Sequence, residues 1–170
     1  VCDGAFYAGK HVAVCGGGNS AVQEALFLCE ICAHVTLIHR RSEFRADPIL
    51  VDKVFAKSNI TVLTDTVVEE LESKDDALCG LRLVNKVTGS VTSLPIDGLF
   101  EAVGHIPETA LAAKLGITEE NQFIHADESC KTTAEGIFVA GDCREKTVRQ
   151  MLTACADGAV AALAACEYCG

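Results

Sequence analysis

Lys10-His-Val-Ala-Val-Cys15, followed by Gly16-Gly-Gly-Asn-Ser-Ala21 and later by His34-Val-Thr-Leu-Ile38, is the part of the sequence that decides the fold. The first and third stretches are short apolar runs of the kind that form buried strands. Residues 19–32 lie between them and carry apolar side chains at helical spacing. Strand, helix and strand within about 30 residues predict a βαβ unit, in which the two strands run parallel.

Further helix and strand signals follow this unit. We expect a helix over 48–57, with Pro48 in its first turn. Five short β-type runs come next, at 60–63, 67–71, 78–86, 90–94 and 99–103, with turns at Thr88-Gly89 and Asp97-Gly98. These runs predict a β-meander that follows the βαβ unit.

The chain changes character near Gly104, where we expect a boundary between two lobes. From Gly104-His-Ile-Pro107 to Gly136 the sequence is polar and rich in turn residues. Residues 137–140 then predict one buried strand, and residues 147–168 predict a long, alanine-rich helix. A strand and a helix are too few to build a core, so we expect the second lobe to be only part of a domain.

The 170 residues carry a net charge of −10, and 49% of them are apolar and 22% charged. This composition excludes a disordered chain, and the acidic charge argues against nucleic acid or an anionic membrane as a partner. The longest apolar run, near 159–166, is shorter than the roughly 20 residues that cross a bilayer. Val1 does not open a secretory signal. We therefore expect a soluble, cytoplasmic protein that binds neither nucleic acid nor membrane.

The ten cysteines are spread along the chain, which favours a reduced, cytosolic set over a disulfide framework. We expect most of them to pack as small apolar side chains. Cys29 and Cys32, and likewise Cys166 and Cys169, have Cys-x-x-Cys spacing late in predicted helices. No second pair is placed to complete four zinc ligands, so we predict no metal site. For Cys166 and Cys169, metal or redox chemistry is the alternative to a structural role.

The glycine-rich stretch after the first strand fits the pattern G-x-G-x-x-A, with Gly16, Gly18 and Ala21 at the fixed positions. Such a loop turns tightly at the first glycine and brings its backbone close to a pyrophosphate at the second. A small residue at the third position lets the helix pack against the strand. The helix N-terminus adds unpaired N–H groups and a positive dipole end. The stretch predicts a dinucleotide site, and a plain glycine-rich turn is the alternative.

Three of the six arginines in the chain, Arg40, Arg41 and Arg45, come directly after the second strand. An NAD site places an acidic residue about 20 residues beyond the glycine loop, on the ribose hydroxyl. This sequence instead has His39-Arg-Arg-Ser-Glu-Phe-Arg45 there. Because guanidinium groups suit a phosphate dianion, the cluster favours NADP(H), held through its 2′-phosphate. A solvated run of charges is the alternative.

These motifs, with others in the same order, resemble the low-molecular-weight thioredoxin reductases over essentially the whole chain. The matching stretches are Val1-Cys2-Asp3-Gly4, Gly16-Gly-Gly-Asn-Ser-Ala21, His39-Arg-Arg41 with Arg45, Phe100 with Gly104-His-Ile-Pro107, and Gly141-Asp142 with Arg149-Gln150. The resemblance implies an α/β flavoprotein with two dinucleotide-binding domains. Residues 1–103 would form a Rossmann-like NADPH-binding domain with a β-meander, and residues 104–170 the C-terminal segment of a split FAD-binding domain.

In that family a Cys-x-x-Cys pair precedes Asp-Gly, and its second cysteine meets the flavin. Cys2 matches this second cysteine, so the resemblance makes it a redox residue of the NADPH-binding domain. Asp3 matches the proton donor proposed for the dithiol step. The first cysteine of the pair would stand just before Val1. A free thiol and a turn residue are the alternative roles for Cys2 and Asp3.

The resemblance also implies two cofactors, NADPH and FAD. In the family, the residue at Asp142 accepts a hydrogen bond from a ribityl hydroxyl, and a helix beginning near Thr147 directs its positive end at the flavin. The residues expected to bind NADPH are Gly16, Gly18, Asn19, Ser20, Ala21, His39, Arg40, Arg41 and Arg45, and those expected to bind FAD are Gly141, Asp142, Arg149, Gln150 and Met151. Two residues depart from the family pattern: Gln23 stands where many members carry Glu near the nicotinamide, and Glu101 replaces a usually apolar residue on the strand leading to Gly104. Both bear on hydride geometry.

The whole enzyme that this chain resembles passes electrons from NADPH through FAD and a CxxC dithiol to thioredoxin. Members of the family are homodimers. Because the first flavin segment and the first redox cysteine lie outside the chain, we expect the isolated chain to bind flavin poorly and not to turn over. The alternatives are a related flavoprotein reductase that serves a peroxiredoxin-type partner, and a non-catalytic NADP-binding module.

Overall fold

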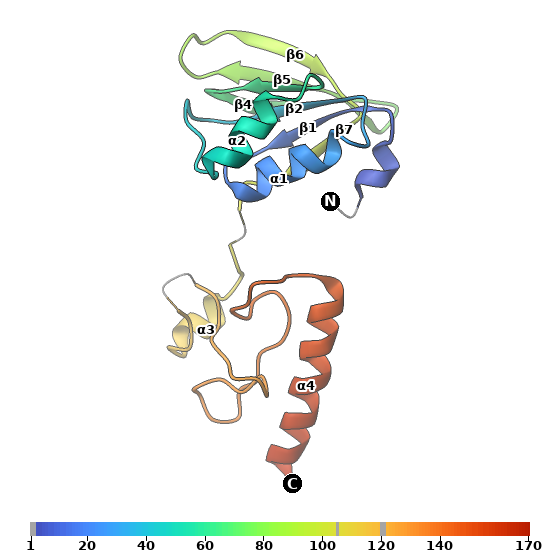
Figure 1. Ribbon diagram of the computed structural model, residues 1–170. Coiled ribbons are helices and arrows are strands. Elements are labelled where there is room, and N and C mark those ends of the chain that lie inside the picture. Colours follow the sequence, from blue (N-terminus) through green and yellow to red (C-terminus); the bar gives the residue numbers. More distant parts are fainter. Residues whose placement is uncertain (1–2, 105, 120–121) are drawn as a thin grey trace. The chain divides into compact units, whose positions relative to one another are not determined.

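The computed structural model describes residues 3–104, 106–119 and 122–170 (Figure 1). The chain divides into two compact units, residues 1–104 and residues 105–170. Among the described residues, the first unit contains both sheets and the second contains two helices joined by long loops. What each unit binds stays a prediction.

The first unit contains a short 3-10 helix, two α-helices and seven strands. They are η1 (Gly4–Tyr7), β1 (His11–Cys15), α1 (Asn19–Leu28), β2 (His34–Ile38), α2 (Pro48–Phe55), β3 (Ile60–Leu63), β4 (Thr66–Lys74), β5 (Ala77–Asn85), β6 (Val91–Pro95) and β7 (Gly98–Glu101). The predicted βαβ unit is confirmed, because β1 and β2 flank α1 and pair in parallel, with His11 opposite His34.

The strands form two sheets rather than one meander after the βαβ unit. The first is a parallel sheet in the order β3-β2-β1-β7, and the second is an antiparallel sheet in the order β4-β5-β6. The expectation that all five runs after residue 59 make one meander is therefore wrong for its first and last members. Periodicity marks a run as a strand, but the pairing of β3 with β2 and of β7 with β1 joins segments far apart in sequence.

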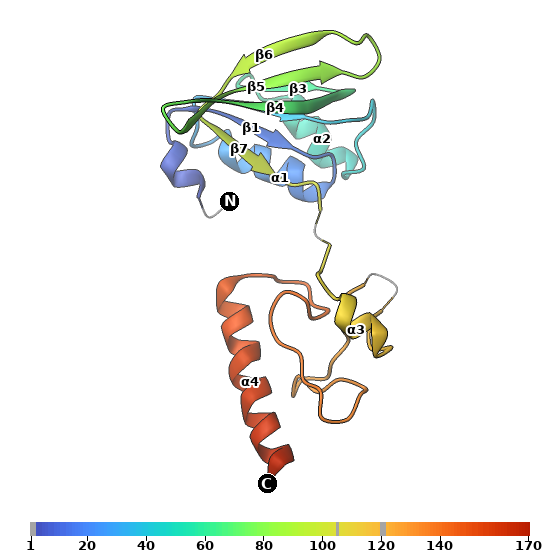
Figure 2. The ribbon, with the colours of Figure 1, turned by 180° about the vertical axis from the view of Figure 1, so that it is seen from behind.

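The parallel sheet lies between the two helices and the antiparallel sheet, as both views show (Figures 1 and 2). Val12 and Val14 of β1 face α1 and α2, and the intervening Ala13 packs against the antiparallel sheet. All three side chains are fully buried. A strand covered on both faces needs a continuous apolar run, which explains why β1 reads as one.

α1 ends at Leu28, so the expected helix over 19–32 is too long at its C-terminus. Residues 29–32 instead form turns, in which the Cys32 amide donates to the Leu28 carbonyl at 2.8 Å. The chain has to reverse there, because β2 begins at His34 beside β1. Cys29 and Cys32 therefore follow the helix, and both are buried in the core.

The second unit contains α3 (Ala110–Lys114) and α4 (Met151–Cys169), with a small core of Ala112, Ile117, Ile124 and Val139. α3 lies in the stretch of residues 104–136 that is polar and rich in turn residues, and it was not expected there. The expected strand over 137–140 is also wrong, since Phe138 makes only an isolated bridge to Lys131. The backbone of this segment bonds to the loop at residues 130–132: the Val139 amide donates to the Cys130 carbonyl at 3.0 Å, and the Thr132 amide donates to the Ile137 carbonyl at 3.1 Å. One bridge of this kind is too short to form a strand.

α4 begins at Met151, four residues after the expected start at Thr147. Gln150 is the N-cap residue and has an extended backbone. Its backbone N–H donates to the Thr153 hydroxyl at 3.1 Å. Among the described residues of α4 only Ala164 is buried. Among the described residues, α4 is the one helix long and apolar enough to cross a membrane. A single such helix is weak evidence for a membrane span, because core helices of soluble proteins pass the same test.

Candidate functional site

The glycine turn lies between the end of β1 and the start of α1. Gly16 has φ +152°, and a Cβ there would lie 2.4 Å from the Ala102 carbonyl oxygen and 2.6 Å from the Ala21 Cβ. The Gly16 amide donates to the Ile38 carbonyl at 3.0 Å. The turn therefore needs glycine at this position, and it packs α1 closely against the sheet through the small side chain of Ala21.

Gly17 and Gly18 face different surroundings. A Cβ at Gly17 would lie 2.1–2.6 Å from three atoms of the His39 ring, whereas a Cβ at Gly18 would meet nothing within 4 Å. Gly18 is also the residue before α1, whose first amides point out of the helix. The bare backbone at Gly18 leaves room for a phosphate to reach these N–H groups.

The arginine loop, residues 39–47, connects β2 to α2 and contains Arg40, Arg41 and Arg45. All three arginines are exposed. Within the described residues their guanidinium groups make no ion pair or hydrogen bond. Three uncompensated positive charges beside a glycine turn suit a multiply charged anion.

His39 is buried under the glycine turn rather than exposed beside the arginines. Its side chain is 5% exposed, its Nε2 lies 2.9 Å from the Glu43 carbonyl, and its ring stacks on Phe44 with centroids 5.0 Å apart. The Arg45 amide donates to the Gly17 carbonyl at 2.7 Å. The structure thus brings the glycine turn and the arginine loop together, with His39 packed between them.

Asn19 and Ser20 begin α1 and are both exposed. The Asn19 side chain is already engaged with Asp47, which caps the start of α2: the Asn19 Nδ2 donates to the Asp47 Oδ2 at 3.1 Å, and the Asp47 amide donates to the Asn19 Oδ1 at 2.7 Å. Sequence reasoning did not include Asp47. No signal in the sequence pairs two residues that are 28 positions apart.

The expected redox residues lie at the N-terminus. Cys2 lies outside the described residues. Asp3 is exposed and precedes η1, where its carbonyl accepts the Phe6 amide at 3.1 Å. Gln23 is exposed on α1, and Glu101 is the last residue of β7.

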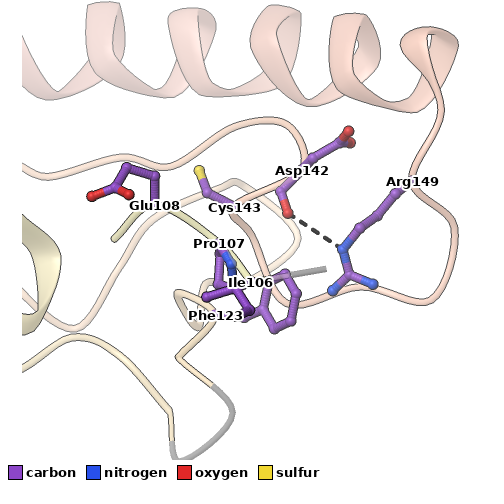
Figure 3. A pocket seen from close by; sticks show the side chains of 7 residues that line it. All are labelled: Ile106, Pro107, Glu108, Phe123, Asp142, Cys143 and Arg149. Carbon is purple, nitrogen blue, oxygen red and sulfur yellow. Dashed lines mark hydrogen bonds between the residues drawn. The ribbon is translucent and has the colours of Figure 1, made fainter. Parts of the chain in front are cut away.

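The second unit has a pocket of about 290 Å³. Its lining residues are Ile106, Pro107, Glu108, Phe123, Asp142, Cys143 and Arg149 (Figure 3). Asp142 and Arg149, two of the residues expected to bind flavin, therefore come together. The Arg149 Nε donates to the Asp142 carbonyl at 3.3 Å, and its guanidinium carbon lies 3.9 Å from the centre of the Phe123 ring. The Asp142 carboxylate points away from that guanidinium (Figure 3).

The turn before this pocket is held by Asp157 of α4, a residue that sequence reasoning missed. Its carboxylate accepts the Gly141 amide at 3.1 Å, an Arg144 Nη1–H at 3.1 Å and a Lys146 Nζ–H at 2.7 Å. Burial acts to raise the pKa of Asp157, but these hydrogen bonds and the two cations outweigh it, so the pKa lies below its usual value. A lone carboxylate in the middle of an apolar helix is the signal that marks it.

Gln150 and Met151 complete the residues expected to bind flavin. Gln150 caps α4, and Met151 is its first residue and is 84% exposed. Neither lines the pocket. Gly141 has φ +83°, which the turn after residue 140 requires.

The described cysteines are free thiols. Burial raises the pKa of Cys29 and of Cys32, and burial with the charge of Glu101 raises the pKa of Cys15 to about 11. Thiols that hold their protons so firmly are weak nucleophiles. Cys166 and Cys169 are exposed at the end of α4.

One group of possible metal ligands occurs among the described residues. Glu119, His125 and Glu145 are all exposed, and their ligand atoms lie within 4.8 Å of one another. The His125 Nδ1 is 3.2 Å from the Glu145 Oε2. Exposed acidic groups commonly gather in this way without an ion, and the prediction of no metal site stays a prediction.

Comparison with known proteins points to one family. Residues 3–158 match the family model of the pyridine nucleotide-disulphide oxidoreductases. The thioredoxin reductase of Listeria monocytogenes serovar 1/2a is 40% identical over 168 residues, which cover 99% of this chain and 53% of that protein. The thioredoxin reductase of Bacillus subtilis strain 168 is 39% identical over the same shares of the two chains.

A solved structure agrees with these relatives. The thioredoxin reductase of Streptococcus pyogenes MGAS5005 has a TM-score of 0.88 and 38% identity, over 98% of this chain and 55% of that one. These matches confirm the resemblance that the motifs indicate. The chain spans about half the length of the relatives it matches.

Proposed function

The chain belongs to the pyridine nucleotide-disulphide oxidoreductase family of enzymes, and on that premise we propose that it is part of a thioredoxin reductase that uses NADPH, FAD and a CxxC dithiol. In this proposal the first unit holds NADPH and the second forms part of the flavin site. The observation that carries it is the open backbone at Gly18 beside three unpaired arginines.

The residues of the first unit fit NADPH in three ways. The glycine turn presents the N-terminus of α1 to a pyrophosphate, and the absent side chain at Gly18 leaves space for it. Arg40, Arg41 and Arg45 would hold the 2′-phosphate, because guanidinium groups pair with a phosphate dianion in a forked geometry. The chain has no acidic residue among residues 39–42, where NADH would require a ribose partner.

The residues of the second unit fit a part of the flavin site. The pocket beside the Gly141–Asp142 turn is lined by Asp142 and Arg149, and the Arg149 guanidinium is a donor there. The Asp142 carboxylate is the proposed acceptor for a ribityl hydroxyl. When bound, NADPH and FAD supply the two-electron chemistry that reduces a disulfide. Cys2 is proposed to receive these electrons at its sulfur atom as the disulfide is reduced. Asp3 is proposed to supply a proton to a thiolate that this reduction releases.

The partner and setting follow from the same proposal. Thioredoxin is the proposed disulfide substrate, and the proposed enzyme is a cytoplasmic homodimer that binds neither nucleic acid nor membrane. The free thiols among the described cysteines support a reducing, cytoplasmic setting. The net charge of −10 argues against nucleic acid or an anionic membrane as a partner.

Titration of the full chain with NADPH and NADH tests the proposal. We expect NADPH to bind more tightly, and the double variant Arg40→Ala with Arg41→Ala to lose about 100-fold in NADPH affinity but little in NADH affinity. Arg82→Ala is the matched control, because Arg82 lies on β5 and pairs with Glu69 and Glu70. Equal affinity of the unmodified chain for the two dinucleotides would refute an NADPH site.

A further inference from the structure

The arginine loop is attached to the glycine turn and to the start of α1 at three points: at its beginning, at Arg45 and at its end. At its start, the buried His39 ring lies against Gly17. In its middle, the Arg45 amide donates to the Gly17 carbonyl at 2.7 Å. At its end, Asp47 is joined to Asn19, the first residue of α1. Of these three attachments, only the last is made by two polar side chains.

The link between Asn19 and Asp47 consists of two reciprocal hydrogen bonds. The Asn19 amide oxygen accepts the Asp47 N–H at 2.7 Å, and the Asn19 amide nitrogen donates to the Asp47 carboxylate at 3.1 Å. One planar amide thus uses both of its ends on a single residue. Asp47 therefore fixes the plane of the Asn19 amide, and a single Nδ2–H is left for another acceptor.

The position of Asp47 matters because it stands two residues after Arg45 and is the cap of α2. The Asp47 carbonyl accepts the Leu50 and Val51 amides, so the loop end and the helix start move together. Holding Asp47 to Asn19 fixes the place where the arginine loop ends. The link also holds a carboxylate that, once released, would stand close enough in sequence to pair with an arginine and compete with a phosphate.

We propose that Asn19 is a positioning residue for the arginine loop and not a ligand of the dinucleotide: through Asp47 it sets the preference for NADPH over NADH. The proposal rests on the proposed NADPH site. A group already held in its binding geometry loses less freedom when the ligand arrives, so the link strengthens only contacts to the additional phosphate. A pyrophosphate contact, by contrast, serves NADPH and NADH equally.

Dissociation constants of the full chain for NADPH and for NADH, measured by calorimetry, separate the two roles. We expect Asn19→Ala to weaken NADPH binding about 3- to 10-fold, the range that one or two modest hydrogen bonds support, and to leave NADH binding within about twofold. Asp47→Ala keeps the hydrogen bond that the backbone N–H of residue 47 donates to Asn19. It should therefore show a smaller loss of NADPH affinity than Asn19→Ala. Asp47→Asn keeps an acceptor for the Asn19 amide and should retain most of the preference.

The double variant Asn19→Ala with Asp47→Ala should bind NADPH no more weakly than Asn19→Ala alone, because the two substitutions remove the same interaction. Ile49→Ala is the matched control, since Ile49 is 71% exposed in the first turn of α2 and its apolar side chain takes no part in the hydrogen bonds of the link. Thermal melts of each variant report whether the unit stays folded.

Equal losses of NADPH and NADH affinity in Asn19→Ala would make Asn19 a pyrophosphate ligand and overturn the inference. An unchanged preference in Asn19→Ala would also overturn it. If the unmodified chain itself shows no preference for NADPH, the proposed function fails first, and that result is visible before any variant is made.

Discussion

Gly17 and Gly18 are adjacent in the sequence, but their missing side chains serve different purposes. The first makes space for the buried His39 ring, and the second leaves an open approach to the start of α1. The sequence pattern marks Gly18 but is indifferent to Gly17, because the middle position of G-x-G accepts any residue. Only the ring of His39, brought underneath by β2, makes glycine necessary at position 17.

Adding one methyl group at each position separates stability from binding. Gly17→Ala should lower the free energy of unfolding by about 1–3 kcal/mol, because its Cβ would overlap the His39 ring. Gly18→Ala should leave the melting temperature nearly unchanged, since its Cβ meets nothing, but should weaken NADPH and NADH binding together. Thermal melts and dinucleotide titrations measure the two effects. Normal affinity in Gly18→Ala would mean that the pyrophosphate binds elsewhere.

At the scale of the elements, α4 depends on Asp157 for its connection to the Gly141 turn. The carboxylate is 12% exposed and shared by the Gly141 amide, Arg144 and Lys146. Such a carboxylate stabilises the fold only while it is ionised. Removing it leaves two cations with no acid partner in a poorly solvated place.

Asp157→Asn should therefore destabilise the second unit by roughly 3 kcal/mol. Faster hydrogen exchange in peptides that cover residues 141–170 would report this loss. Glu167→Gln is the matched control, because Glu167 is exposed on the same helix. Unchanged exchange in Asp157→Asn would show that the cluster adds nothing to stability.

The same carboxylate predicts a pH dependence with a defined sign. Its folded pKa lies below its unfolded value, so protons bind more readily to the unfolded chain. The stabilisation is complete above the usual carboxyl pKa of about 4 and is lost as the pH falls through the lowered folded value. Hydrogen exchange of residues 141–170 should accelerate over this acidic range in the unmodified chain and change less in Asp157→Asn.

Whether a segment has strand character was easier to predict than which other strand it pairs with. Residues 60–63 and 99–103 are correctly predicted as β-type, yet β3 and β7 join the parallel sheet and leave β4, β5 and β6 as the antiparallel one. Residues 137–140 carry the apolar pattern of a strand, yet they make only an isolated bridge, between Phe138 and Lys131. Apolar periodicity reports burial, whereas a strand also needs a second segment at hydrogen-bonding distance.

At the scale of the whole molecule, the two units differ in how much of a site each contains. The glycine turn and the arginine loop are together in the first unit, whereas the second offers a pocket of about 290 Å³ that holds two of the residues expected to bind flavin. We expect the chain to bind NADPH but, with FAD and a disulfide dye added, to show no rapid reduction of the dye. Absorbance of the dye over time measures this. Rapid flavin-dependent reduction would contradict it.

The sequence by itself determined the glycine turn, the arginine cluster and the βαβ unit, because each depends on residue types within one short segment. Backbone freedom at Gly16, positive charge at residues 40–45 and apolar runs are properties that a residue carries wherever it stands. Only the tertiary structure decided that Asn19 meets Asp47, that His39 lies under Gly17 and that Asp157 meets Lys146. These contacts join segments that packing alone brings together, so no local pattern contains them.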